Sequence, residues 1–329
     1  MSALKVPADQ LSNRLRQAFE KAGVAPANAA SVSSALIAAE LDGLSSHGLG
    51  RLKAYLAQAR SGKVNGQAEP RLTWTKPALA WIDACDGFAF PAVDLATEAL
   101  VKTAAEQGVA AAAINNSHHA GVLGQPVERL ARRGLIGLMM ANSPKAIAPW
   151  GGKDGLFGTN PIAFACPRPQ GNPLVIDLSL SKVARGKVMV AAQRHEPIPD
   201  DWALDADGRP TTDPEAALAG TMVPMGDAKG AQLVLMVEIL AAALPAACFG
   251  FEAASFFTAE GAPPRVGQFL LAIDPTAASD RWDERIETLL SAIAAQEGTR
   301  LPGQRRYQIR AERKAVGVDV PEDLMELLA

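Results

Sequence analysis

Aromatic residues and cysteine are both scarce in this sequence of 329 residues, and each shortage argues against a class of site. Phe, Trp and Tyr together make up 5% of the chain and alanine is abundant, which favours tightly packed helices over an aromatic binding surface. The cysteines form no Cys-x-x-Cys pair, so we expect neither a zinc knuckle nor a thioredoxin-type site. Cys85, Cys166 and Cys248 are widely spaced and odd in number, which suits free thiols in a reducing compartment.

The sequence also has no strong excess of charge and no uninterrupted apolar run. Its net charge of -3 gives no broad electrostatic reason to expect nucleic acid or an anionic membrane as a partner. The most apolar stretch, residues 233–249, contains Glu238 and Pro245, so it predicts a buried helix instead of a membrane span. The first residues include Lys5 and Asp9 and form no apolar segment, so we expect no signal peptide.

Glycine motifs that bind nucleotides are absent as well. Neither Gly-x-Gly-x-x-Gly nor a Walker A sequence occurs, so motifs alone predict no nucleotide cofactor. Other glycine-rich turns occur at residues 150–161 and 225–230. In the second turn, Lys229 beside free N–H groups at a helix start could bind an anion. An ordinary helix start is nevertheless the preferred interpretation of this turn taken alone.

Predicted strands and helices alternate along the chain, which is typical of an α/β fold. The first helix is expected at residues 9–22, where Asp9 could cap it and Leu11, Leu15 and Phe19 share one face. Further helices are expected at residues 27–41, 52–59, 93–107, 127–133, 229–244 and 280–295. Strands are expected at residues 72–83 (one strand or a hairpin), 109–114, 135–140, 161–166, 174–176 and 269–273. The charged tail from residue 303 is expected to pack on the outside, and residues 205–214 form the best candidate loop.

The sequence contains four histidines, and two of the segments that carry them indicate a reactive site. His47 lies between two predicted helices, with Ser46 before it and Arg51 four residues after it. Histidine titrates near neutral pH, and arginine can bind a carboxylate in bidentate fashion. If a helix begins here, His47 and Arg51 share a face. The segment indicates a proton-transfer site for a carboxylate-bearing substrate, and a buried or helix-capping histidine explains His47 equally well.

His118 and His119 follow the predicted strand at residues 109–114. Adjacent side chains diverge, and no Asp or Glu lies nearby in the sequence, so we expect no metal site here. The fourth histidine, His195, lies in a polar stretch and is expected at the surface.

Several segments match one family in its order. They are residues 44–48 with Arg51, 117–119 with Gly121, 142–144 with 149–152, 157–161, 176–179, 229–230 and 300–303. Together they resemble the type 2 malate/L-lactate dehydrogenase family, also described as sulfolactate dehydrogenase-like. This family includes ureidoglycolate dehydrogenase and the piperideine- and pyrroline-2-carboxylate reductases. One such segment is a weak signal, but the ordered set covers nearly the whole chain.

The resemblance implies an NAD(P)-dependent oxidoreductase, with NADP slightly favoured, whose mixed-sheet cofactor domain is not Rossmann-like. It implies hydride transfer between 2-oxo and 2-hydroxy acids of the malate, lactate or sulfolactate type. The alternative is reduction of cyclic 2-imino acids such as piperideine- and pyrroline-2-carboxylate. A cytoplasmic homodimer that binds a small carboxylate is also implied. We expect a helical, substrate-side region at residues 1–115, a cofactor-binding domain at 116–275, and a C-terminal segment at 276–329 that packs back on the N-terminal region.

The family's functional residues carry over to positions that match its motifs. His47, with Ser46 beside it, matches the proton donor, and Arg51 matches the arginine that binds the substrate carboxylate. His119 matches the histidine of the family's Ser-x-His-Phe-Gly pattern, and Ala120 in place of the phenylalanine predicts a wider pocket. Thr159 is the second expected substrate contact. The expected cofactor contacts are His119, Ala120, Gly121, Ser143, Asp177, Leu178, Ser179, Lys229, Arg300 and Gly303.

One departure from the family bears on the substrate. The imine-reducing branch carries an aspartate near the position of Lys187, so the lysine favours a 2-oxo acid. The basic run at residues 182–187 could also attract a doubly anionic substrate such as malate or sulfolactate, or could form a solvated helix or loop face. Two other classes compete. A silent binding protein of the same fold is disfavoured by the intact His47, Arg51 and His119, and a metal-dependent hydrolase by the lack of nearby carboxylates.

Overall fold

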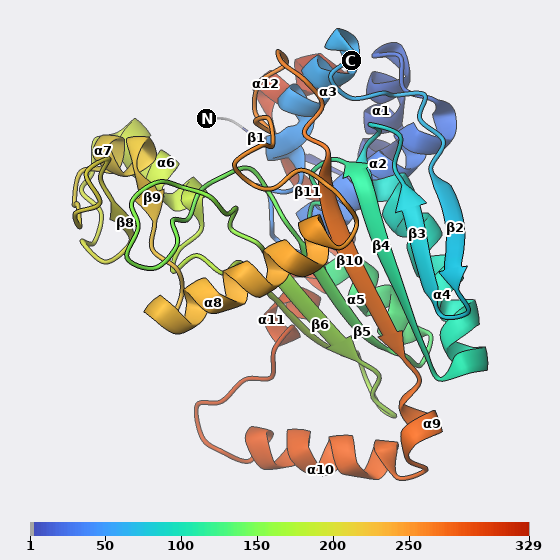
Figure 1. Ribbon diagram of the computed structural model, residues 1–329. Helices are drawn as coiled ribbons and strands as arrows, with labels where there is room; N and C mark the ends of the chain where they lie inside the picture. The colour runs from blue at the N-terminus through green and yellow to red at the C-terminus, as the bar shows by residue number, and fades with distance from the viewer. Residues whose placement is uncertain (1–2, 329) are drawn as a thin grey trace.

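A seven-stranded mixed sheet forms the centre of the fold in the computed structural model, which describes residues 3–328 (Figure 1). In spatial order its strands are β2 (Arg71–Lys76), β3 (Leu79–Asp83), β4 (Val109–Ser117), β10 (Val266–Ile273), β5 (Ile136–Ala141), β6 (Ile162–Cys166) and β7 (Leu174–Leu178). β3 and β4 pair in parallel, and the other neighbours pair antiparallel. The predicted α/β class with a mixed sheet is confirmed, and the predicted element at residues 72–83 is the β2–β3 hairpin.

Helices cover both faces of this sheet (Figure 1). They are α4 (Ala89–Gln107) and α5 (Gly124–Arg132) on one face, and α8 (Asp227–Glu238), continued by a π-helix (Ile239–Ala243), on the other. Alternate residues of β4 on the first face include Ala110 and Ala112, whose small side chains let α4 approach closely. Because successive strand residues point to opposite faces, Met139 belongs to the core under α4 and α5, and Met140 to the core under α8.

The two ends of the chain meet in a helical unit beside the sheet (Figure 1). Its elements are β1 (Ala3–Val6), α1 (Ala8–Lys21), α2 (Pro26–Leu41), α3 (Leu52–Ser61), α11 (Gln304–Val316), β11 (Val318–Pro321), α12 (Glu322–Met325) and a 3-10 turn (Glu326–Leu328). β1 and β11 pair antiparallel, and Val318 and Val320 are buried in one core with Leu11, Leu15 and Phe19. The prediction that the whole tail packs on the outside is therefore wrong, because alternate valines of β11 face this core.

The sequence predicted the starts of most helices to within a few residues, but it predicted the wrong N-cap for the first one. Pro7 is the N-cap of α1, and Asp9 lies in its first turn, so the predicted Asp9 cap is wrong. The Asp9 charge still lies near the partially positive end of the helix. Two further helices, α9 (Pro275–Ala278) and α10 (Trp282–Ala294), connect β10 to α11. The sheet takes strands from both sides of residue 115, and the boundaries expected at 115 and 275 stay a prediction.

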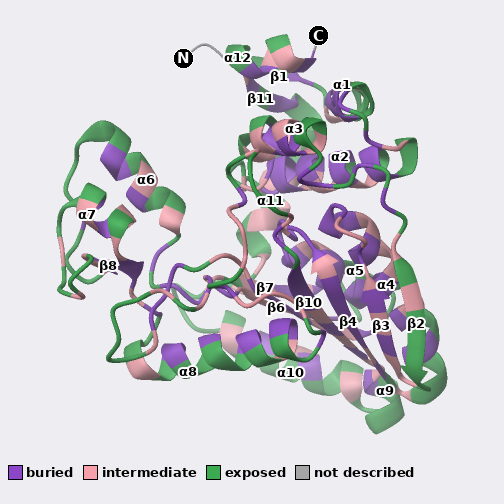
Figure 2. Ribbon diagram, turned by 45° about the horizontal axis from the view of Figure 1, so that its top comes forward, coloured by how far each residue is buried: buried purple, intermediate pink, exposed green. Residues whose placement is uncertain are grey.

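A smaller lobe projects on the left of Figures 1 and 2. It contains α6 (Arg185–Arg194), β8 (Ala203–Leu204), α7 (Pro214–Ala219) and β9 (Thr221–Met222). The basic run at residues 182–187 leads into α6 in this lobe, away from the α2–α3 turn that carries His47. The predicted loop at residues 205–214 connects β8 to α7. His195 follows α6 and is exposed, as predicted.

The outer face of α8 and its π-helical continuation is apolar and exposed. Leu233 is 41% exposed, Met236 37% and Ile239 52%, whereas Val234 and Val237 are buried. The prediction of a buried helix is therefore wrong for one side of this element. No helix in the described part of the chain is long and apolar enough to cross a membrane.

Candidate active site

His47 lies in a tight turn between α2 and α3 and not at the start of an α-helix. Its amide donates to the Leu44 carbonyl at 2.8 Å, and a short 3-10 helix (Leu49–Arg51) follows. The predicted common helical face for His47 and Arg51 is therefore wrong. Instead, Arg51 Nε donates to the Ser46 carbonyl at 2.9 Å, and this bond brings the guanidinium back to the turn.

The rings of His47 and His119 stack, with centroids 5.5 Å apart and planes at 29°. His119 follows the end of β4, so a loop from the sheet meets a turn from the helical unit at this pair. Ser46 Oγ lies 3.0 Å from His47 Nδ1, and the Tyr55 hydroxyl lies 2.6 Å from His119 Nδ1. With both Nδ1 atoms engaged, Nε2 is the nitrogen of each ring left for a bound molecule.

Tyr55 is a site residue that the sequence reasoning missed. It is fully buried on α3, one helical turn after Arg51. Burial raises the pKa of its hydroxyl above the usual value, so it stays protonated at neutral pH. The i,i+4 spacing from Arg51 was the available signal.

Burial keeps these histidines neutral in the free protein. Desolvation, helped by the Arg51 charge, lowers the pKa of half-buried His47 to about 4. Burial lowers the pKa of His118 to about 3, with smaller contributions from Lys63 and Arg51, and holds the pKa of His119 well below its usual value. An anion bound at Arg51 would offset the arginine charge and so favour protonation of His47.

Arg51 has a buried nitrogen that needs an acceptor. Its Nη1 atom has no hydrogen-bond partner among residues 3–328, and its guanidinium carbon lies 4.7 Å from the centroid of the Phe257 ring. A buried guanidinium N–H without an acceptor is costly. The site therefore fits an anion, such as a carboxylate, bound at Nη1 close to His47 and His119.

Two buried side chains hold the segment 255–260 over this site. Lys63 Nζ donates to three backbone carbonyls of the segment at 2.8, 3.0 and 2.9 Å, and Gln58 Nε2 donates to two at 2.9 and 3.0 Å. Phe256 thereby lies with its ring centroid 5.1 Å from that of His119. Sequence reasoning missed both residues, because their acceptors lie almost 200 positions away and no local pattern signals them.

His118 is buried among aromatic rings. Its centroid lies 5.5 Å from that of Tyr55, 5.8 Å from Phe88 and 5.3 Å from Phe256, and neither of its ring nitrogens has a partner among the described residues. Aromatic packing accounts for its position. Within residues 3–328, no group of three or more His, Cys, Asp or Glu side chains could hold a metal ion.

The structure brings Ser143 and Thr159 together. Ser143 Oγ accepts from the Thr159 amide at 3.2 Å. Behind them the buried carboxylate of Glu238 accepts from Asn142 Nδ2 at 3.2 Å and from Asn160 Nδ2 at 2.7 Å, and so joins the two loops. Burial raises the pKa of Glu238. Sequence reasoning noted Glu238 only as a break in an apolar run, since its partners are not visible from local sequence.

Asp177 marks a second cluster, at the end of β7. Its Oδ2 accepts from the Gly124 amide at 2.8 Å and lies 3.6 Å from Arg306 Nη2. Burial raises the pKa of Asp177. Arg306 was not predicted, yet its Nη1 atom is buried without a partner among the described residues. The Thr159 carbonyl accepts from the Leu180 amide at 2.9 Å, which connects this cluster to Thr159.

The remaining predicted cofactor contacts are distributed around these clusters. Ala120 and Gly121 follow His119, and Gly121 has φ +67° with Phe90 2.8 Å from where its Cβ would lie, so only glycine fits. Ser179 Oγ lies 2.8 Å from Ser181 Oγ. Leu178 is 39% exposed, and Lys229 and Arg300 are exposed. Gly303 is the N-cap of α11 and lies next to the Val175 backbone. No side-chain hydrogen bond or ion pair among the described residues joins Lys229 or Arg300 to these clusters.

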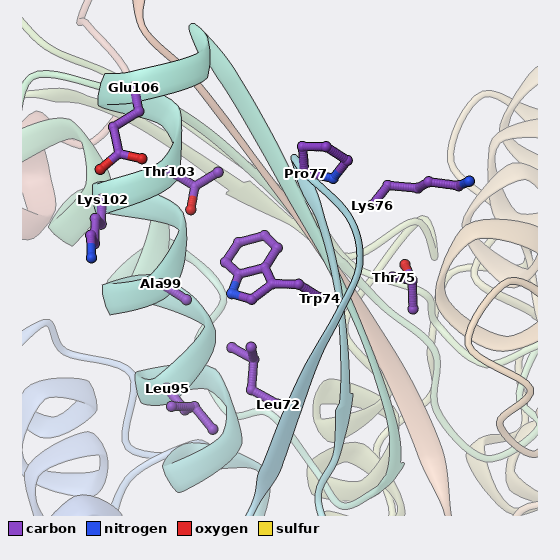
Figure 3. Close-up of a pocket in the computed structure, with 10 residues that line it drawn as sticks. All are labelled: Leu72, Trp74, Thr75, Lys76, Pro77, Leu95, Ala99, Lys102, Thr103 and Glu106. Atoms are coloured by element: carbon purple, nitrogen blue, oxygen red, sulfur yellow. The ribbon is translucent and has the colours of Figure 1, made fainter.

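Two surface hollows are lined by neither His47 nor His119. One, of about 690 Å³, lies between β2 and α4 and is lined by Leu72, Trp74 and Leu95 among others (Figure 3). Its walls carry no predicted site residue. The other, of about 300 Å³, lies among α2, α4, α5 and α11 and includes Ala120. The unpartnered buried Arg51 nitrogen and the stacked histidines are therefore better markers of a reactive site than either hollow.

Solved structures share this architecture. A Δ1-piperideine-2-carboxylate reductase from Pseudomonas syringae is 40% identical, with a TM-score of 0.93, over 99% of this chain and 100% of that chain. A sulfolactate dehydrogenase from Methanocaldococcus jannaschii is 29% identical, with a TM-score of 0.91, over 99% and 95%. The overall fold of this chain thus matches the folds of these two proteins.

The malate/L-lactate dehydrogenase family model matches residues 6–329. A (2R)-3-sulfolactate dehydrogenase (NADP(+)) from Chromohalobacter salexigens is 55% identical over 311 residues, which cover 94% of this chain and 93% of the relative. The chain therefore belongs to the malate/L-lactate dehydrogenase family, and the resemblance drawn from its ordered segments is confirmed.

Proposed function

We propose that this protein is an NADP-dependent oxidoreductase that interconverts a 2-oxo acid and the corresponding 2-hydroxy acid, with 3-sulfolactate and sulfopyruvate as the favoured pair. The observation that carries the proposal is the buried, unpartnered Nη1 of Arg51 beside two stacked histidines. The 55% identity to a relative named (2R)-3-sulfolactate dehydrogenase (NADP(+)) supports the choice of substrate and cofactor.

The residues of the turn have distinct roles in this proposal. Arg51 binds the substrate carboxylate and so fixes which face of C2 is presented for reaction. Reduced nicotinamide, when bound, supplies the hydride that adds to C2. His47 donates a proton from Nε2 to the oxygen on C2, while Ser46 holds its Nδ1. The bound carboxylate offsets the Arg51 charge, which raises the pKa of His47 from its low value in the free protein.

His119 stacks against His47 at the proposed reaction site. Tyr55 holds its Nδ1, and Phe256 packs on its ring. We assign His119 to orienting the substrate or nicotinamide, with Thr159 as a second substrate contact.

We further propose that the cofactor lies along residues 119–121, Ser143, residues 177–179, Lys229 and the segment before α11 that carries Arg300 and Gly303. The unpartnered Nη1 of buried Arg306 next to Asp177 supports this path, because it offers a cation where a phosphate or ribose could supply an acceptor. A cofactor domain over residues 116–275 would then be non-Rossmann in kind, consistent with a sheet whose strands mostly pair antiparallel.

The exposed apolar face of α8 supports a homodimer. Leu233, Leu235, Met236 and Ile239 are 37% to 52% exposed on one element, and a contiguous apolar face of this kind is typical of an interface. We propose that a second copy of the chain covers this face. We also propose a cytoplasmic location, because Cys85, Cys166 and Cys248 are free thiols, as a reducing compartment favours.

Reduction of cyclic 2-imino acids is the second candidate, because a Δ1-piperideine-2-carboxylate reductase is 40% identical and has a TM-score of 0.93. Lys187 does not separate the two candidates. It lies on α6, in the lobe away from the turn that carries His47, with its ammonium 5.8 Å from the centroid of the Trp202 ring.

A substrate panel separates the two candidates. Sulfopyruvate, oxaloacetate, pyruvate, Δ1-piperideine-2-carboxylate and Δ1-pyrroline-2-carboxylate are each assayed with NADPH and NADH. We expect the highest kcat/KM for sulfopyruvate with NADPH. A higher value for a cyclic imine identifies an imine reductase, and no turnover together with no change in NADPH or NADH fluorescence on titration contradicts the oxidoreductase assignment.

A further inference from the structure

We infer that Glu40 is a positioning residue that fixes the turn carrying Ser46 and His47; the inference rests on the proposed role of that turn. Glu40 lies in the last turn of α2 and is 1% exposed. Its Oε1 accepts from the Leu49 amide at 2.7 Å, and its Oε2 accepts from Ser45 Oγ at 2.8 Å. One carboxylate therefore bonds to the turn on both sides of His47.

Close packing of Glu40 against Gly48 also restricts the position of the turn. A Cβ at position 48 would lie 2.8 Å from the Glu40 carboxylate carbon, which is closer than real Cβ contacts. Glu40 reaches the Leu49 amide because residue 48 has no side chain. Any side chain there must displace either the carboxylate or the turn that follows His47.

Arg313 on α11 binds the same carboxylate. Its Nη1 lies 3.4 Å from Glu40 Oε2 and also donates to the Glu40 carbonyl. A buried carboxylate is costly unless it is both paired with a charge and hydrogen-bonded. The donors that meet this need come from the turn and from α11, so α11 contributes to the position of His47 without touching it.

A positioning role differs measurably from a purely structural one. A carboxylate that only stabilised the fold would change the melting temperature of a variant and leave turnover by the folded enzyme unchanged. A carboxylate that places a proton donor changes kcat, because a displacement of about 1 Å can cost roughly a hundredfold in rate. Binding of NADPH, which the proposed function places along residues 119–121, Ser143 and residues 177–179 and not at Glu40, should stay at its wild-type Kd.

The test compares graded variants at Glu40. Glu40→Gln keeps an acceptor for the Leu49 amide but loses the charge opposite Arg313, whereas Glu40→Ala loses every contact. We expect kcat for the best substrate of the panel to fall about tenfold in Glu40→Gln and about a hundredfold or more in Glu40→Ala. Ser45→Ala removes one bond only and tests the inference if the Glu40→Ala protein does not fold.

Glu128→Gln is the matched control. Glu128 is also buried, at 4% exposure, and also binds α11 through Arg310 at 2.7 Å. None of its hydrogen bonds among the described residues involves the turn. We expect this variant to melt at a lower temperature and to keep the wild-type kcat.

A second readout needs no substrate. The Cε1–H signal of His47 is assigned in the NMR spectrum of the free protein by its loss in His47→Gln. We expect it to shift in Glu40→Gln, Glu40→Ala and Ser45→Ala and to stay unchanged in Glu128→Gln. A wild-type signal together with a wild-type kcat in the Glu40 variants overturns the inference. If the wild-type protein reduces nothing in the panel, the proposed function fails, while the NMR signal still decides the role of Glu40.

Discussion

Arg51 combines a fixed side chain with a free buried donor, and this makes it the most direct test of substrate binding. Arg51→Lys keeps the positive charge and loses the planar fork. We expect kcat/KM to fall about tenfold to a hundredfold, as the loss of about 1.5–3 kcal/mol from a hydrogen bond to a charged group implies. Steady-state kinetics measure the fall, and fluorescence titration should give an unchanged Kd for NADPH. An unchanged kcat/KM would mean that Arg51 is structural.

The two stacked histidines differ in their expected contribution to proton transfer. His47→Ala should lower kcat by about a hundredfold or more, the range for loss of a positioned general acid. Reduction by the wild type should slow as pH rises past the pKa of His47 in the substrate complex, because only the protonated ring can donate. His119→Ala should also lose activity but should keep this pH dependence. If His47→Ala instead keeps the wild-type rate and profile while His119→Ala loses both, His119 is the proton donor.

His118 links the aromatic packing to acid stability. Burial lowers its pKa from 6.5 to about 3, so between these values the unfolded chain binds a proton that the folded chain does not. Stability from this residue is therefore complete above about pH 6.5 and is lost as the pH falls towards 3. His118→Phe keeps a ring among Tyr55, Phe88 and Phe256 and removes the titrating group. Between pH 7 and pH 5, we expect the wild type to lose about 2 kcal/mol more unfolding free energy than the variant. Urea unfolding at the two pH values measures this, and equal losses would contradict it.

At the scale of single elements, length and periodicity decided what could be predicted. The strands β4, β5, β6 and β7 of the main sheet could be predicted, because each is an apolar run between turns. β1 and β11 were not, because a strand of four residues is stabilised by its partner and not by its own composition, and here the partners lie at opposite ends of the chain. The π-helical end of α8 was predicted as part of an ordinary helix. Its burial was also mispredicted, because an apolar sequence does not reveal which side of a helix is covered.

The apolar face of α8 gives a prediction at this same scale. Met236→Glu with Ile239→Glu places two charges on the face and should convert a dimer into a monomer. Light scattering after size-exclusion chromatography measures the mass. Leu289→Glu on α10 is the matched control, because Leu289 is 57% exposed and lies outside the face. A double variant that stays dimeric would exclude α8 as the interface.

Across the whole molecule, the site could be predicted as a set of residues but not as an arrangement. The ordered family segments indicated Ser46, His47, Arg51 and His119 although they lie on two different units of the fold. Glu40, Tyr55 and Lys63 could not be predicted, because their importance depends on burial and on partners brought close by folding. The same reason explains the error at His47 and Arg51, where a turn and one hydrogen bond replace the helical face that spacing alone suggested.

The pairing of β1 with β11 brings segments near the two ends of the chain together, as Ala3 lies opposite Pro321 in the upper part of Figure 1. The same contacts could therefore form in a chain whose elements follow one another in a permuted order. A circular permutant with a flexible Gly-Ser linker between residues 328 and 3, opened in the loop at residues 205–210, keeps both strands of that pair and the turn that faces His119. It should fold and reduce substrate at close to the wild-type rate, and loss of both would show that the lobe containing α6 and α7 depends on an uncut chain.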